Sequence, residues 1–125
     1  MLKDLLFFLS FYNSAKLFHF STKYYSAHKS SDDFANTYLT LLDKFWEVYQ
    51  GKYEKLTVNK EKEKKIYIKL WTDKSIHSEL DNFITFLYDS TLIKMLEQNN
   101  DTEMLNIRDE LVGHINQFKY LLKFK

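Results

Sequence analysis

Four stretches of the chain carry apolar residues at helical spacing. The first covers about residues 2 to 23, and the second begins between Ser26 and Ser31 and runs to a plausible stop at Gly51. The third runs from Ile76 to Met95 and is broken by the sequence QNND, and the fourth carries Leu111 to Leu122 and continues to the C-terminus. The chain has no Pro and only two Gly, which disfavours turn-rich β architectures, so the sequence predicts an all-α fold of four helices.

The connection between the second and third helices indicates their relative direction. It spans residues 52 to 73, 22 residues, whereas antiparallel neighbours need only about 2 to 8. Extended at about 3.3 Å per residue, it could easily run the length of a helix of about 36 Å. We therefore expect these two helices to be parallel, which describes a ferritin-like four-helix bundle with a long crossover. In the crossover, the sequence KIYIKLW alternates in the manner of an extended strap lying on the bundle: Ile66, Ile68 and Leu70 on one side, Tyr67, Lys69 and Trp71 on the other.

Composition narrows the class of protein. The 125 residues fit a single domain, residues 1 to 125, and 45% hydrophobic content supports a real core. Eighteen basic and 17 acidic residues leave a net charge of +1, so nucleic acid is not an expected partner. No segment reaches the roughly 18 apolar residues that span a bilayer, so a membrane is not expected either. Cysteine is absent, which excludes thiolate chemistry, and no phosphate loop or nucleophile elbow supports a kinase or hydrolase.

The candidate chemistry lies along the second helix. Counting 100° per residue from His28, the side chains of Asp32, Asp43 and Glu47 fall at roughly 40°, 60° and 100°, which places all four on one stripe beside the apolar face. His28 and Asp43 are about 22 Å apart along the axis, too far to share one metal ion. The stripe therefore contains two separate pairs.

These two pairs are symmetric about the middle of the helix. His28 and Glu47 are equally far from the point between residues 37 and 38, and so are Asp32 and Asp43. If the helix packs antiparallel against its copy across a two-fold axis at that point, His28 opposes Glu47 and Asp32 opposes Asp43. Two identical sites then form between the chains, each with one imidazole and several carboxylates, a set that suits iron, manganese or zinc.

The pattern His28, Asp32, Asp43, Glu47 resembles the ferroxidase ligands of Dps proteins, the dodecameric miniferritins, whose iron site lies between two subunits. Those proteins add a histidine near the end of the preceding helix, and His19 in LFHFSTKYYSAH occupies that place, at a shorter interval than is usual there. The segment from residue 17 to residue 53 also looks like a small Dps-like family of phages and large DNA viruses. The resemblance implies an iron-binding ferroxidase, a two-fold homodimer that can build a dodecameric cage, and a location in the cytoplasm, or in host cytoplasm or virion if viral.

Other interpretations stay open. Asp32 can simply be a first-turn acid favoured by the helix dipole, and Asp43 with Glu47 an acid pair on a solvated face. The protein can then be a structural or interaction bundle without metal turnover, or a DNA-coating protein, which the near-neutral charge disfavours. Two further spaced pairs are weaker metal candidates: His77 with Asp81, and Glu110 with His114. No E-x-x-H sequence is present, so we expect no di-iron centre inside one subunit.

Overall fold

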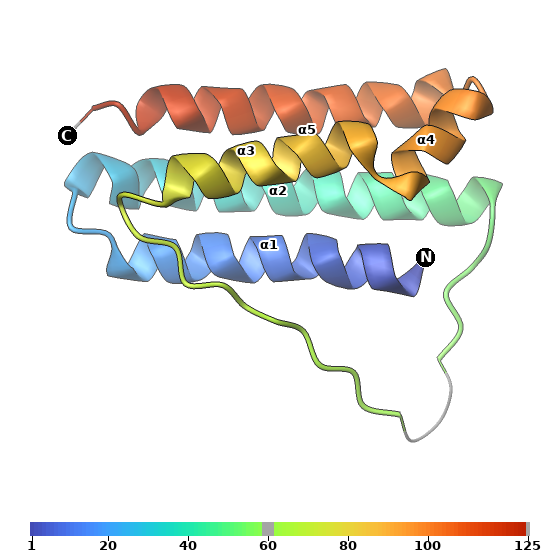
Figure 1. Cartoon of the computed structure of the whole chain (residues 1–125), viewed down its shortest axis with the longest axis horizontal. Helices are drawn as coiled ribbons and strands as arrows, with labels where there is room; N and C mark the ends of the chain where they lie inside the picture. The colour runs from blue at the N-terminus through green and yellow to red at the C-terminus, as the bar shows by residue number, and fades with distance from the viewer. Residues whose placement is uncertain (59–61, 125) are drawn as a thin grey trace.

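The regular elements of the described chain are all helices. The computed structural model describes residues 1–58 and 62–124, and its helices are α1 (Leu2–Ser21), α2 (Tyr25–Lys52), α3 (Ile76–Asp89), α4 (Thr91–Gln98) and α5 (Thr102–Leu121). The four longer helices form the bundle and α4 lies across one end of it (Figure 1). The predicted all-α class and four-helix architecture are confirmed.

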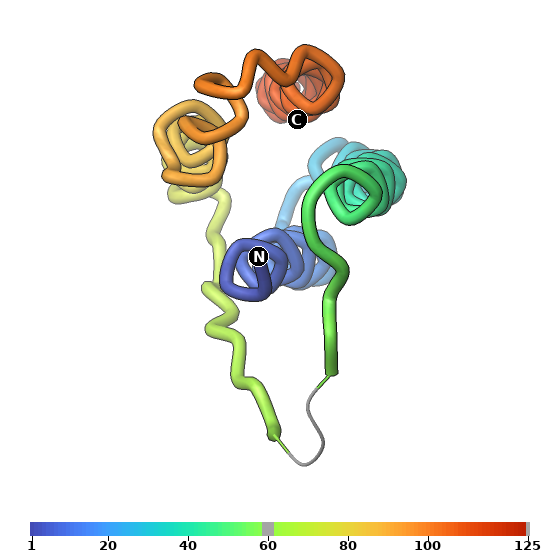
Figure 2. Tube along the Cα trace, turned by 90° about the vertical axis from the view of Figure 1, so that its right-hand side faces the viewer, coloured from blue at the N-terminus to red at the C-terminus, as the bar shows by residue number. Residues whose placement is uncertain are grey.

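The order of directions is that of a ferritin-like bundle. Helix α2 runs antiparallel to α1, the crossover returns the chain to the starting end of α2, and α3 then runs parallel to α2 (Figure 1). Helix α5 is antiparallel to α3. In the end view α2 lies next to both α1 and α5, and its contacts with these two helices are the most extensive in the bundle (Figure 2). The parallel arrangement expected from the long connection is confirmed.

Aromatic rings fill the centre of the bundle. Phe11 of α1 stacks on Phe83 of α3 with ring centroids 3.9 Å apart, and Phe8 lies 5.1 Å from Phe45 of α2. The hydroxyl of buried Tyr38 donates a hydrogen bond of 2.8 Å to the carbonyl of Phe8. These contacts fix α1 against α2 and α3, and so set where the polar face of α2 lies.

The third predicted helix is interrupted. It was expected to continue through Met95, but α3 ends at Asp89 and α4 begins after Ser90. The Ser90 hydroxyl accepts a hydrogen bond from the backbone N–H of Ile93 (3.3 Å), so Ser90 is the N-cap of a new helix. The bend lets the apolar side of α4 turn onto the end of the bundle, where Leu92, Ile93 and Leu96 are buried.

The crossover is extended, and its last part contacts α1 and α3 through Tyr67, Lys69 and Trp71. Of the crossover residues that the structure describes, only Trp71 is buried, at 5% exposure; Ile68 is 44% and Leu70 is 74% exposed, so two of the three apolar residues on the predicted side of the strap stay open to solvent. Figure 2 shows the yellow-green end of the crossover passing beside α1 and its green part leading away from the bundle. The neighbouring charged residues 62 to 65 are exposed, and their solvation favours a path through solvent. No helix in the described part of the chain combines the length and the hydropathy that crossing a membrane requires.

Candidate functional site: the histidine pair at the junction of α1 and α2

The junction between α1 and α2 is a short turn tied to the start of α3. The backbone N–H of Thr22 closes the last turn of α1 on Phe18 O (2.9 Å). The side chain of Thr22 donates to Asp73 Oδ1 (2.5 Å), and the Lys23 N–H donates to Asp73 Oδ2 (3.2 Å). Because the turn is held from outside, the last turn of α1 and the first turn of α2 lie at a fixed separation.

Two histidines face each other across this junction. The rings of His19 and His28 stack with centroids 4.1 Å apart and an interplanar angle of 16°. His19 Nδ1 lies 2.6 Å from the carbonyl oxygen of His28, and His28 Nδ1 lies 2.8 Å from the carbonyl oxygen of His19. A carbonyl only accepts hydrogen bonds, so each Nδ1 carries its hydrogen. In the neutral rings, each Nε2 therefore keeps a lone pair that can bind a metal ion.

Ser31 supports the pair from below. Its hydroxyl, fully buried, donates to His28 O (3.0 Å) and lies 3.2 Å from His19 Nδ1. His19 is buried and His28 is exposed. Carbonyl and hydroxyl partners on the far nitrogen are the usual way in which proteins orient an imidazole that acts as a ligand.

Asp32 lies beside the histidines. Its Oδ1 is 3.9 Å from His19 Nε2 and 3.3 Å from the Lys16 ammonium. The structure therefore places His19 next to both His28 and Asp32, with a lysine against the carboxylate. Lys16 and Ser31 were not identified from the sequence, because their roles depend on the angle between two helices and on no local motif.

Asp43 and Glu47 do not join this group within one chain. Both are exposed on α2, and Asp43 lies 15 residues from His28, about 22 Å along the axis. Within residues 1–58 and 62–124, no group of three or more His, Cys, Asp or Glu side chains is placed to hold a metal ion. Within one chain the predicted ligands thus lie in two groups, His19, His28 and Asp32 at the α1–α2 junction and Asp43 and Glu47 farther along α2; the sharing of each site between two chains stays a prediction.

The weaker candidate pairs have carboxylates engaged by lysines. Asp81 accepts a hydrogen bond from Lys119 (2.5 Å), and Glu110 lies 3.6 Å from the Lys44 ammonium. Neither arrangement adds a further metal-binding side chain. The two lysine–carboxylate ion pairs instead join neighbouring helices, α5 with α3 and α2 with α5.

A second polar cluster, missed from the sequence, surrounds buried Asp101. The carboxylate accepts hydrogen bonds from Lys52 Nζ (2.7 Å), the Tyr53 hydroxyl (2.6 Å) and the backbone N–H of Met104 (3.1 Å). Burial alone would raise the pKa of Asp101, but these three hydrogen bonds outweigh it and hold the pKa below its usual value. The order Asn-Asp-Thr-Glu ahead of an apolar run is the N-cap signal that could have identified it. This cluster joins the end of α2 to the start of α5.

Comparison with known proteins identifies a family but no activity. Residues 19–122 match the model of a family of unknown function, DUF5856, and the chain belongs to that family. No curated protein matches the chain. No solved structure matches it either.

Proposed function

For this member of the DUF5856 family, we propose that two copies of the chain pair antiparallel along α2 and bind and oxidise Fe(II) at the two sites formed between them. Each site takes His19, His28 and Asp32 from one copy and Asp43 and Glu47 from the other. The observation that carries the proposal is the reciprocal pair of hydrogen bonds between His19 and His28.

These hydrogen bonds prepare both rings as ligands before any metal arrives. With each Nδ1 donating to a carbonyl, both rings are held in the tautomer that leaves Nε2 free, and both rings are oriented. Asp32 adds an oxygen donor 3.9 Å from His19 Nε2. Two imidazoles with carboxylates form a donor set suited to Fe(II), with Mn²⁺ and Zn²⁺ as substitutes.

The second copy supplies the charge that the first half lacks. Asp43 and Glu47 are exposed, and they mirror Asp32 and His28 about the middle of α2. With Asp32 they give three carboxylates, which favour the ferric over the ferrous ion. The oxidant, oxygen or peroxide, accepts the electron that Fe(II) gives up. Storage of ferric iron in a larger cage would be a separate, later step.

Lys16 sets the electrostatics around Asp32 in this half of the site. Its ammonium, 3.3 Å from Asp32 Oδ1, balances the carboxylate and competes with a metal ion for it. Lys16→Gln should therefore tighten Fe(II) binding. If Asp32 is only a surface partner of Lys16, the same substitution changes stability by less than about 1 kcal/mol and leaves iron binding as it was.

The test measures Fe(II) oxidation by the absorbance of the ferric product, with circular dichroism to verify folding. Asp32→Asn and Glu47→Gln should each slow oxidation about 10- to 100-fold, and the double variant should lose little more, because the two residues serve one site. Glu103→Gln, an exposed carboxylate on α5, is the matched control. Unchanged oxidation in both single variants, or a wild-type rate no better than iron in buffer, would overturn the proposal.

Mixing the two inactive variants tests the shared site directly. A mixed dimer of Asp32→Asn and Glu47→Gln chains carries one site with both substitutions and one site with neither. Random pairing makes half the dimers mixed, so about a quarter of the wild-type activity should return. A site formed within one chain predicts no recovery.

A further inference from the structure

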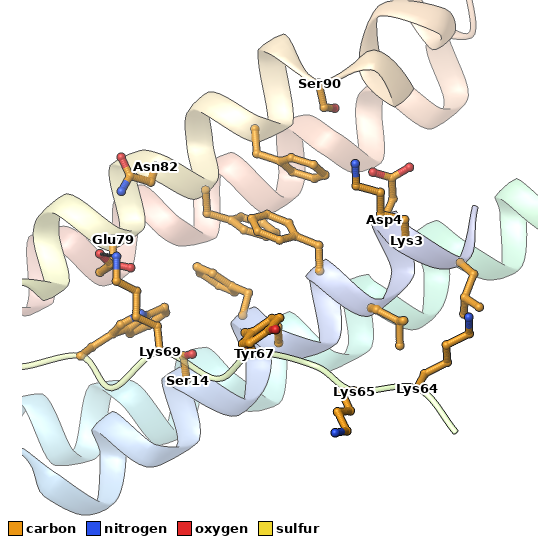
Figure 3. Close-up of a pocket in the computed structure, with 18 of the residues that line it drawn as sticks. Lys3, Asp4, Ser14, Lys64, Lys65, Tyr67, Lys69, Glu79, Asn82 and Ser90 are labelled. Carbon is orange, nitrogen blue, oxygen red and sulfur yellow. Dashed lines mark hydrogen bonds and ion pairs between the residues drawn. The ribbon is translucent and has the colours of Figure 1, made fainter. Parts of the chain in front are cut away.

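A long groove runs between α1, α3 and the crossover, and no residue of α2 lines it. Its volume is about 1220 Å³. The walls are mostly apolar and include Leu6, Phe7, Phe11, Trp71, Phe83 and Phe86. Figure 3 shows aromatic rings following one another along the groove. A concave, aromatic-lined space of this size is typical of a binding site for an apolar molecule.

Phe7 lines the groove and presents part of its ring to solvent. Its ring packs 4.5 Å from Phe86 and 5.7 Å from Phe83, measured between centroids, yet 45% of the residue remains exposed. The crossover covers the groove without filling it. A hydrogen bond from Ser10 Oγ to the Tyr67 carbonyl attaches it to α1, while Leu70 stays 74% exposed.

The two ends of the groove differ in charge. At the far end, Lys69 and Glu79 form an ion pair of 2.8 Å, which leaves that end neutral. At the end near the N-terminus of α1, Lys3 and Lys64 lie on either side of the opening with Asp4, and Lys65 lies close by on the crossover (Figure 3). In the described part of the chain, none of these three lysines forms an ion pair. Among the charged residues that line the groove at this end, three lysines thus stand against one aspartate.

We propose that this groove binds a long-chain carboxylate, with its hydrocarbon chain along the phenylalanines and its carboxylate between Lys3 and Lys64. A single charged end next to an apolar channel matches a ligand with one anionic head. An acidic amphipathic helix would instead need cations along the whole length of the groove. From Lys3 to Ser14, α1 lines the groove over about 16 Å, a length of the order of an extended dodecanoate chain. This proposal does not depend on iron binding.

Titration with dodecanoate tests it, followed by isothermal calorimetry and by tryptophan fluorescence, since Trp71 lines the groove. We expect saturable binding that weakens by up to about fourfold for each methylene removed from the chain, as apolar burial predicts. Lys3→Gln with Lys64→Gln should weaken dodecanoate binding about tenfold and leave dodecanol, the neutral alcohol of the same chain length, unaffected.

Phe7→Asp places a carboxylate in the channel and should abolish binding of both compounds. Phe20→Asp is its matched control, because Phe20 is an exposed phenylalanine of the same helix, 73% exposed, that does not line the groove. Circular dichroism verifies folding of every variant. Equal losses from Phe7→Asp and Phe20→Asp would overturn the proposal. So would unchanged dodecanoate binding in the lysine variant, or no saturable binding by the wild type.

Discussion

Asp101 should contribute more to the stability of the bundle than any exposed carboxylate, because it joins two helix ends at once. It is 7% exposed, caps α5 through the Met104 N–H, and accepts hydrogen bonds from Lys52, the last residue of α2, and from Tyr53, which follows it. Asp101→Ala removes all of these contacts together. Asp101→Asn can keep the oxygen that caps α5, but it removes the charge and replaces Oδ2, which accepts the Tyr53 hydrogen bond, with an amide nitrogen.

The structure sets the size of each effect. Loss of the cap costs about 1 kcal/mol, and loss of a hydrogen bond to a buried charged group costs about 1.5 kcal/mol, so Asp101→Ala should lower the free energy of unfolding by about 2 to 3 kcal/mol. Asp101→Asn should cost about 1 kcal/mol. The control is Glu103→Gln, which removes a carboxylate that also binds Lys52 (3.0 Å) but is 63% exposed, and should stay within about 0.5 kcal/mol.

Urea unfolding across a pH series tests the charge. The folded-state pKa of Asp101 lies below its unfolded value near 3.8, so its stabilisation is present above that value and is lost as the pH falls through the folded pKa. The difference in unfolding free energy between wild type and Asp101→Asn should therefore be full at pH 7 and shrink in this acidic range. A difference that is independent of pH, or a Glu103→Gln variant as unstable as Asp101→Ala, would refute the reasoning.

Three further substitutions probe the core by urea unfolding. Tyr38→Phe should cost about 1 kcal/mol, because the Phe8 carbonyl loses a buried donor. Burial raises the pKa of Tyr38, so its stabilisation is present below the unfolded value of about 10 and lost as the pH rises toward the folded pKa; a tyrosinate absorbance titration of Tyr38→Phe should lack one late step seen in wild type. Phe83→Ala should cost about 3 to 5 kcal/mol, since its ring is central to the aromatic core, and a cost under about 1 kcal/mol would contradict that packing. Arg108→Lys should cost about 1 to 2 kcal/mol through the lost hydrogen bond to the Leu87 carbonyl, and unchanged stability would show that lysine replaces it.

The bundle could be predicted from the sequence because helical periodicity and connection length are both local, countable features. A connection of 22 residues between the second and third helices was enough to predict that they are parallel. The break at Ser90 could not be predicted in the same way, since apolar spacing continues across it through Leu87, Leu92 and Leu96. A serine inside a helix and a serine capping a new one look alike until tertiary contacts select the cap.

For the candidate metal site, the sequence indicated which residues of α2 share one stripe, but not the geometry at the α1–α2 junction. Spacing on one helix placed His28, Asp32, Asp43 and Glu47 on one stripe, and that part follows from the period alone. The partnership of His19 with His28 depends instead on a turn that Asp73, just before α3, holds in place. The competing charge of Lys16 is likewise a product of how α1 packs on α2.

The reciprocal hydrogen bonds between His19 and His28 orient both rings more than a role in packing alone would require. A buried histidine needs its polar atoms satisfied, and one bond from His19 Nδ1 would do this for its donor. His28 is exposed, however, so water could satisfy its ring, yet its Nδ1 is bonded to the carbonyl of His19. Both rings are thus oriented by the same nitrogen, and His19 Nε2 lies 3.9 Å from the Asp32 carboxylate, which also pairs with Lys16. Fixed tautomers near solvent are what the proposed metal binding by Nε2 requires. The mixed-variant experiment determines whether α2 of a second chain supplies the remaining ligands.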